Sequence, residues 1–152
     1  AYDGKSLKQI GKIEGLCVKD LNGDDTFGIK GDGRVRAYER AMFLQTWFYY
    51  KYYSLDSNHM LTAVIEELYP CTSEQKLKVR KGFHLYESPL SDKVSAEIMA
   101  GDEIQLLGCD GIEWCMAAAK DGTKGWFAVD GYKVRELDTG VFDVFEGLCM
   151  AD

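Results

Sequence analysis

Histidine and proline are scarce in this sequence, with two residues of each among 152. The histidines are His59 and His84, and no two cysteines stand in a Cys-x-x-Cys pair. Zinc sites are built from closely spaced cysteines and histidines. The sequence therefore argues against a zinc site.

Long hydrophobic runs are also missing. The longest uncharged aromatic-rich run covers residues 41–50, contains Gln45 and Thr46, and stops at Lys51. A membrane-spanning helix needs about 20 apolar residues, so we expect no transmembrane segment. No signal peptide is visible, yet the sequence opens abruptly with AYDGK, which we interpret as the cut edge of a longer protein.

Basic residues are fewer than acidic ones, and the difference is concentrated in the C-terminal half of the chain. The net charge is -7, and residues 71–152 carry nine Lys or Arg against fifteen Asp or Glu, a balance of -6. An acidic surface repels phosphate groups. This charge argues against nucleic acid, anionic membranes and phosphate-rich wall polymers as partners.

The cysteines form no readable disulfide framework. Five of them stand at positions 17, 71, 109, 115 and 149, an odd number with irregular spacing. Cys109 and Cys115 flank the segment DGIEW and could face each other across a hairpin.

Aromatic residues and glycines are plentiful, and they predict strands joined by tight turns. Aromatics make up 12% of the chain, and sixteen glycines include those of Asn22-Gly23, Asp32-Gly33 and Asp121-Gly122. Asp-Gly and Asn-Gly pairs tolerate the positive φ angles of hairpin turns. The expected fold class is all-β.

Three segments leave alternatives open. Residues 34–53 are one strand buried on both faces, two strands, or a helix, and their aromatic density favours strand. Residues 60–69 are a short helix or a strand, with strand preferred. The acidic tail 138–152 adds either an edge strand or a short helix.

Four pieces in order between residues 77 and 129 resemble a bacterial SH3-type domain. They are LKVRKGFHLYESPLSDKV, AEIMAGDEIQLLG, GIEWCMAAA and DGTKGWFAV. The resemblance implies a small SH3-like barrel over 71–137, after an N-terminal antiparallel β region over 1–70 and before the acidic tail 138–152. One departure is Arg80-Lys81-Gly82-Phe83-His84, where the family has an Arg-Ser-Gly-Pro-like turn.

A weaker resemblance concerns the N-terminal part. Residues 1–35 resemble β-propeller-like repeats, through YDGKSLKQIGKIEG and VKDLNGDD. Together the two resemblances imply the C-terminal part of a secreted or lipid-anchored surface protein of Gram-positive bacteria. The implied location is extracytoplasmic.

Four aromatic residues are the candidate ligand-binding residues. Trp126, Tyr86, Phe127 and Trp114 either line a groove for a peptide or sugar or fill the core, because a small barrel needs its large side chains inside. A second candidate is a calcium loop with ligands Asp20, Asn22 and Asp24. That segment fails the helix-loop-helix calcium pattern, and an acidic Asn-Gly turn is the simpler interpretation.

Catalysis has little support in the sequence. A cysteine peptidase needs a thiolate, a histidine and an orienting group, and no motif joins Cys71 to His59 or His84. The expected function is a non-catalytic extracytoplasmic binding module without a cofactor.

Its partner would be a cell-wall peptide or glycan, or another surface protein. The alternatives are a structural spacer or assembly module, with the barrel packed on the N-terminal sheet, and an accessory fragment of a cell-wall peptidase.

Overall fold

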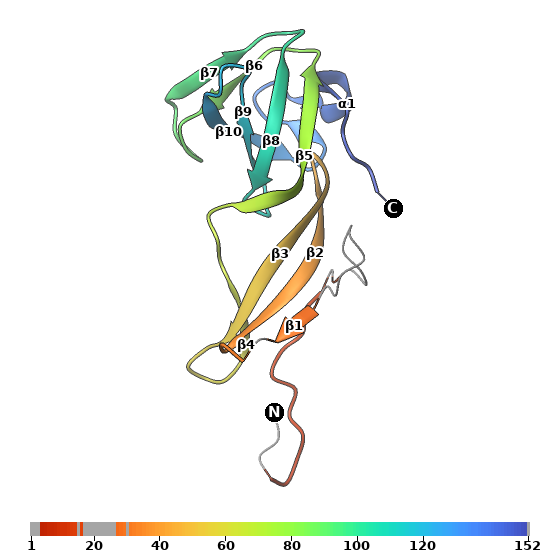
Figure 1. The fold of residues 1–152 in the computed structure, drawn as a ribbon. Coiled ribbons are helices and arrows are strands. Elements are labelled where there is room, and N and C mark those ends of the chain that lie inside the picture. Colours follow the sequence, from red (N-terminus) through yellow and green to blue (C-terminus); the bar gives the residue numbers. More distant parts are fainter. Residues whose placement is uncertain (1–3, 15, 17–26, 30, 152) are drawn as a thin grey trace. The chain divides into compact units, whose positions relative to one another are not determined.

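The computed structural model describes residues 4–14, 16, 27–29 and 31–151. Antiparallel strands build its sheets, and α1 (Val141–Val144) is the one helix within this described part of the chain (Figure 1). The predicted all-β fold class is confirmed.

The chain divides into two compact units. Unit 1 comprises Ala1–Arg40 and Tyr49–Glu66, and unit 2 comprises Ala41–Phe48 and Glu67–Asp152. The acidic tail thus belongs to unit 2, together with a short segment from the middle of the aromatic run.

A four-stranded sheet has the order β1-β2-β3-β4. Its strands are β1 (Phe27–Ile29), β2 (Arg34–Phe43), β3 (Gln45–Leu55) and β4 (Leu61–Val64). Between β2 and β3, Leu44 has a φ of 59°, which reverses the chain. The segment 34–53 is therefore two strands of a hairpin. The strand preferred for 60–69 is confirmed over Leu61–Val64.

Unit 1 buries a carboxylate by giving it partners. Glu39 is 7% exposed, accepts a hydrogen bond from the Tyr53 hydroxyl, and lies 3.9 Å from the Lys51 ammonium. Nearby, the Arg36 guanidinium lies 4.4 Å from the ring centroid of Tyr50. A buried charge is tolerated only when it is paired and hydrogen-bonded. The Tyr53 hydroxyl and the Lys51 ammonium provide these partners for Glu39.

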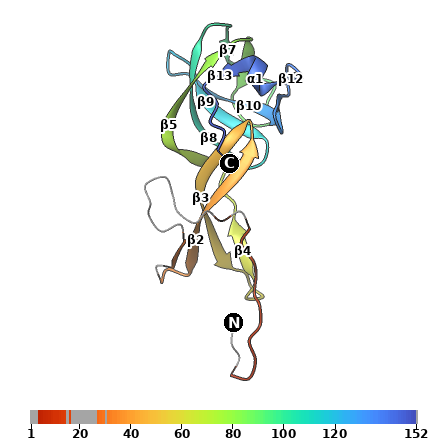
Figure 2. The ribbon, with the colours of Figure 1, turned by 90° about the vertical axis from the view of Figure 1, so that its right-hand side faces the viewer.

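Unit 2 contains the larger sheet, with the order β12-β11-β10-β9-β8-β5-β13 and β6 pairing with both β10 and β7. Its strands are β5 (Tyr69–Val79), β6 (Phe83–Tyr86), β7 (Val94–Ile98), β8 (Glu103–Cys109), β9 (Trp114–Ala118), β10 (Lys124–Asp130), β11 (Lys133–Val134), β12 (Thr139–Gly140) and β13 (Phe145–Glu146). Helix α1 lies against β11, β12 and β13 (Figure 2). Both alternatives for the tail therefore occur, a short helix followed by an edge strand.

The Asp121-Gly122 turn joins β9 and β10 as the sequence predicts. Gly122 has a φ of 87°, and the Ala119 N–H donates to the Thr123 carbonyl at 2.8 Å. Asp121 Oδ1 accepts from the Thr123 N–H at 2.9 Å, which fixes the turn locally. The Trp126-Phe127 pair follows as part of strand β10.

Three phenylalanines form the centre of the unit 2 core. The ring centroid of Phe83 lies 5.2 Å from that of Phe127 and 5.4 Å from that of Phe145, and the last two are 5.8 Å apart. All three side chains are buried. Because they belong to β6, β10 and β13, their packing joins segments that are far apart in the sequence.

The turn between β2 and β3 is held inside unit 2. The Leu44 N–H donates to the Gly131 carbonyl, and the Thr46 N–H to the Cys149 carbonyl, both at 2.8 Å. The side-chain amides of Gln45 and Gln75 donate to each other at 2.7 and 2.5 Å. Gln45 is 1% exposed, so this reciprocal pair satisfies an amide that would otherwise be costly to bury.

At Gly125, strands β10 and β6 approach too closely for a side chain. A Cβ there would lie 2.7 Å from Leu85 Cβ and 2.9 Å from the Tyr86 carbonyl oxygen. Gly125→Ala should therefore lower the free energy of unfolding of unit 2 by roughly 1–3 kcal/mol, the usual cost of overpacking. Urea denaturation followed by tryptophan fluorescence measures it, because Trp47, Trp114 and Trp126 all belong to unit 2.

The matched control is Gly140→Ala. A Cβ at Gly140 meets its nearest atom, Asp143 Oδ2, at 3.8 Å, and the backbone φ is -57°. We expect this variant to lose at most about 0.5 kcal/mol. Equal stability of the two variants would contradict the proposed close approach of β10 and β6.

Candidate functional site

A cavity of about 410 Å³ lies on unit 2 beside strands β6, β9 and β10. We call it the aromatic cavity. It is lined by Tyr86, Ser91, Asp92, Trp114, Phe127, Ala128, Val134, Arg135 and Glu136. Three of the four aromatic residues singled out from the sequence meet here, although they come from three different strands.

The fourth aromatic residue does not line this cavity. Trp126 is 7% exposed and pairs across the sheet with Tyr86 on one side and Met116 on the other. Phe127 projects to the opposite face of β10, because neighbouring residues of a strand alternate. There it packs in the phenylalanine core and is 2% exposed. Trp114 also lines the cavity but is only 9% exposed. The half-buried Tyr86 is consequently the lining aromatic residue with the most accessible side chain.

Glu136 fixes the position of Tyr86. Its Oε2 accepts a hydrogen bond from the His84 N–H at 3.0 Å and a longer one from the Tyr86 hydroxyl at 3.4 Å. Its Oε1 lies 2.6 Å from His84 Nδ1. Burial raises the pKa of the Tyr86 hydroxyl, and the charge and hydrogen bond of Glu136 raise it further. Tyr86 thus stays a neutral donor at ordinary pH.

The other two charged groups of the aromatic cavity differ in whether their charge is paired. The Arg135 guanidinium forms an ion pair with Glu113, which leaves its charge largely compensated. Asp92 adds an exposed carboxylate from the loop between β6 and β7. The lining therefore offers aromatic surface together with acceptor oxygens, which suits apolar C–H faces and N–H or O–H donors of a ligand.

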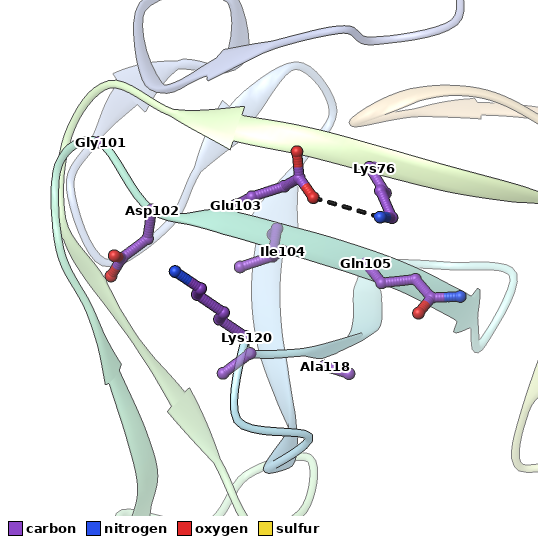
Figure 3. A pocket seen from close by; sticks show the side chains of 9 residues that line it. Lys76, Gly101, Asp102, Glu103, Ile104, Gln105, Ala118 and Lys120 are labelled. Carbon is purple, nitrogen blue, oxygen red and sulfur yellow. Dashed lines mark ion pairs between the residues drawn. The ribbon is translucent and has the colours of Figure 1, made fainter.

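A second hollow, of about 520 Å³, lies along β8 and is lined largely by charged and small residues. Figure 3 shows Lys76 and Glu103 facing each other, joined by an ion pair of 3.4 Å, while Lys120 extends toward the end where Asp102 lies. Such exposed pairs contribute at most about 1 kcal/mol. With both charge signs present and no aromatic side chain, this hollow has no marked preference for one class of ligand.

The calcium prediction lies outside the described residues, since Asp20, Asn22 and Asp24 all fall in the segment 17–26. Within the described part of the chain, no group of three or more His, Cys, Asp or Glu side chains is arranged to hold a metal ion. Among the same residues, no helix is both long and apolar enough to cross a membrane.

Comparisons with known proteins give no match: no family model fits the chain, and neither a curated protein nor a solved structure resembles it significantly. The resemblance to bacterial SH3-type domains therefore rests on the residues quoted above.

Sequence reasoning missed the polar half of the aromatic cavity. Asp92 stands inside the first piece of the family resemblance but was not singled out there. Arg135 and Glu136 stand in a stretch without a motif, and the tight turn at Gly131 brings them back beside β10. The Arg135 N–H donates to the Ala128 carbonyl at 3.0 Å, which fixes this return. For Arg135 and Glu136, the sequence signal was their place shortly after the final hairpin.

The pKa of Tyr86 gives a direct test of the Glu136 contact. Glu136→Gln should lower this pKa toward 10, because the carboxylate no longer repels the phenolate. It should remain somewhat raised, because burial persists. A pH titration of tyrosine ring carbons by NMR measures the change.

The matched control for this titration is Glu87→Gln. Glu87 is adjacent in sequence to Tyr86, and its carboxylate pairs with Lys93 at 2.6 Å. We expect the Tyr86 pKa to be unchanged in this variant. A similar decrease in both variants would show that general surface charge, rather than Glu136, sets the pKa.

Proposed function

We propose that unit 2 is an SH3-like barrel that acts as a non-catalytic extracytoplasmic binding module for a cell-wall peptide or glycan. The observation that carries the proposal is the meeting of Tyr86 and Trp114, from β6 and β9, in one cavity of about 410 Å³.

The order of strands supports the barrel. Strands β8, β9 and β10 form a meander, β5 pairs with β8 on one side and with β13 on the other, and the β6–β7 hairpin is inserted between β5 and β8 in sequence. A small barrel likewise combines a meander with a closing C-terminal strand. In the described residues, β13 is the C-terminal strand and pairs with β5 through the register Phe145↔Val79.

The chemistry of the aromatic cavity supports the class of ligand. Peptides and sugars present apolar C–H faces, which pack on tyrosine and tryptophan rings, and polar N–H and O–H groups, which carboxylates accept. Glu136 and Asp92 provide such acceptors. They also repel phosphate groups, which favours the peptide or glycan of a wall over an anionic polymer.

Co-sedimentation with purified Gram-positive peptidoglycan tests this function. The natural chain should pellet with the wall, and Tyr86→Ala should weaken binding roughly tenfold, because loss of an aromatic contact costs on the order of 1–2 kcal/mol. Tyr132→Ala is the matched control, since Tyr132 is 37% exposed and lies outside the cavity lining.

Circular dichroism establishes that each variant is folded before the comparison. Equal binding by Tyr86→Ala and Tyr132→Ala would move the binding site elsewhere on the molecule. If the natural chain does not pellet at all, the wall-binding function is wrong.

The competing function is a structural spacer or assembly module. The observation that favours it is the buried hairpin turn of unit 2, where Gln45 and Thr46 are 1% and 3% exposed. Absence of wall binding in a folded natural chain would favour this second function.

A further inference from the structure

Three cysteines lie on three neighbouring strands of unit 2. Cys71 belongs to β5, Cys109 to β8 and Cys115 to β9, and the sheet order places β8 between the other two. Cys109 and Cys115 are direct cross-strand partners, and both are 0% exposed. All three are free thiols.

The register of Cys109 and Cys115 is the one that brings side chains closest. The adjacent pair, Asp110 and Trp114, is hydrogen-bonded, with the Asp110 N–H donating to the Trp114 carbonyl at 3.0 Å. Because hydrogen-bonded and non-hydrogen-bonded pairs alternate, the cysteines occupy a non-hydrogen-bonded pair, whose Cα atoms lie about 4.5 Å apart. Disulfides span Cα separations of about 4.4–6.8 Å. A bond between them therefore needs no rearrangement of the hairpin.

We call Cys71, Cys109 and Cys115 the cysteine row. Cys71 is the member of this row that solvent reaches. It is half-buried and lines a surface hollow of about 340 Å³ together with Thr72, Ser73 and Glu74. Burial raises the pKa of both Cys109 and Cys115, and the charge of Cys71 raises it further.

The backbone around Cys71 also permits local movement. Two residues earlier, Tyr69 is the direct partner of Cys109, and the register of β5 then shifts between Pro70 and Gln75. Cys71 is a diagonal neighbour of Cys109, at a typical Cα distance of about 7–8 Å. A lasting bond at that distance needs backbone movement, whereas a transient one needs only a local shift of this irregular segment.

We propose that Cys109 and Cys115 form a reversible cross-strand disulfide, made and broken through Cys71, with a low-molecular-weight disulfide or thiol as the co-reactant. This site is independent of the aromatic cavity and of the ligand proposed for it.

Oxidation of Cys109 and Cys115 proceeds by three thiol–disulfide exchange steps. The Cys71 thiolate attacks the small disulfide, forms a mixed disulfide, and releases one small thiol. Cys109 then attacks the Cys71 sulfur and releases the second small thiol, leaving Cys71 bonded to Cys109. Finally Cys115 attacks Cys109 and frees Cys71. In total, two protein thiols are oxidised, and one small disulfide is reduced to two thiols.

Burial makes the oxidation slow near neutral pH. It raises the pKa of Cys71 to about 11 and that of Cys109 to about 12. Only thiolates attack disulfides, so the reactive fraction is small at neutral pH and rises about tenfold per pH unit below the pKa. The rate of oxidation should therefore increase steadily between pH 7 and 10.

Oxidised glutathione is the probe for the experiment. The natural chain is incubated with it at several pH values, and intact mass and peptide mapping follow the products. We expect loss of two hydrogens and a Cys109–Cys115 linkage, formed at least tenfold more slowly in Cys71→Ser. Cys149→Ser is the matched control, because Cys149 is exposed and outside the row, and its rate should equal that of the natural chain.

The possible results decide between the parts of the proposal. A linkage that joins Cys71 or Cys149 in the final product would overturn the Cys109–Cys115 bond, as would stable mixed disulfides alone. Oxidation of the Cys71→Ser variant at the natural rate would remove Cys71 from the path.

A Cys115→Ala variant tests the order of steps. It should stop at a mixed or Cys71–Cys109 disulfide, and loss of two hydrogens with a different pairing would contradict that order.

Discussion

Packing of Phe83, Phe127 and Phe145 is the interaction on which unit 2 depends. These three rings, with centroids 5.2 to 5.8 Å apart, join a hairpin, a central strand and the C-terminal tail. The rings meet because Gly125 lets β10 approach β6 without a side chain between them. The same contact between β6 and β10 carries Tyr86, which supplies one wall of the aromatic cavity.

The aromatic cavity follows from this arrangement. On β10 the core side belongs to Phe127, while the opposite side carries Trp126 and Ala128, whose partners are Tyr86 and Trp114. The cavity is thus a product of strand register, and Glu136 completes it by holding the Tyr86 hydroxyl. Aromatic surface and acceptor oxygens meet there because the chain returns at Gly131 after β10.

Strand register also determines which cysteines are neighbours in the cysteine row. Direct pairing of Cys109 and Cys115 follows from the short turn between β8 and β9, in which Asp110 Oδ1 accepts from the Ile112, Glu113 and Trp114 N–H groups. These hydrogen bonds fix the turn that sets the register of the two cysteines. Their burial keeps them reduced when thiolate is scarce, and their proximity permits a bond when it is not.

Local backbone chemistry made much of the fold predictable. The turn at Asp121-Gly122, the strand over Leu61–Val64 and the all-β class follow from residues whose preferences act within a few positions. Two segments, 34–53 and 138–152, instead had alternatives that only tertiary contacts decided. The hairpin of 34–53 depends on Leu44, whose positive φ no local pattern announces, and the tail 138–152 became helix and strand because Phe145 pairs with Val79.

By itself, then, the sequence determined where strands and turns occur, that the surface is acidic, and which aromatic residues deserved attention. Only the tertiary structure decided that Tyr86 and Trp114 share a cavity while Trp126 does not, and that Glu136 belongs with them. The physical reason is that turn and strand preferences are properties of neighbours in the chain. A cavity depends on strand register and on packing between residues that are tens of positions apart.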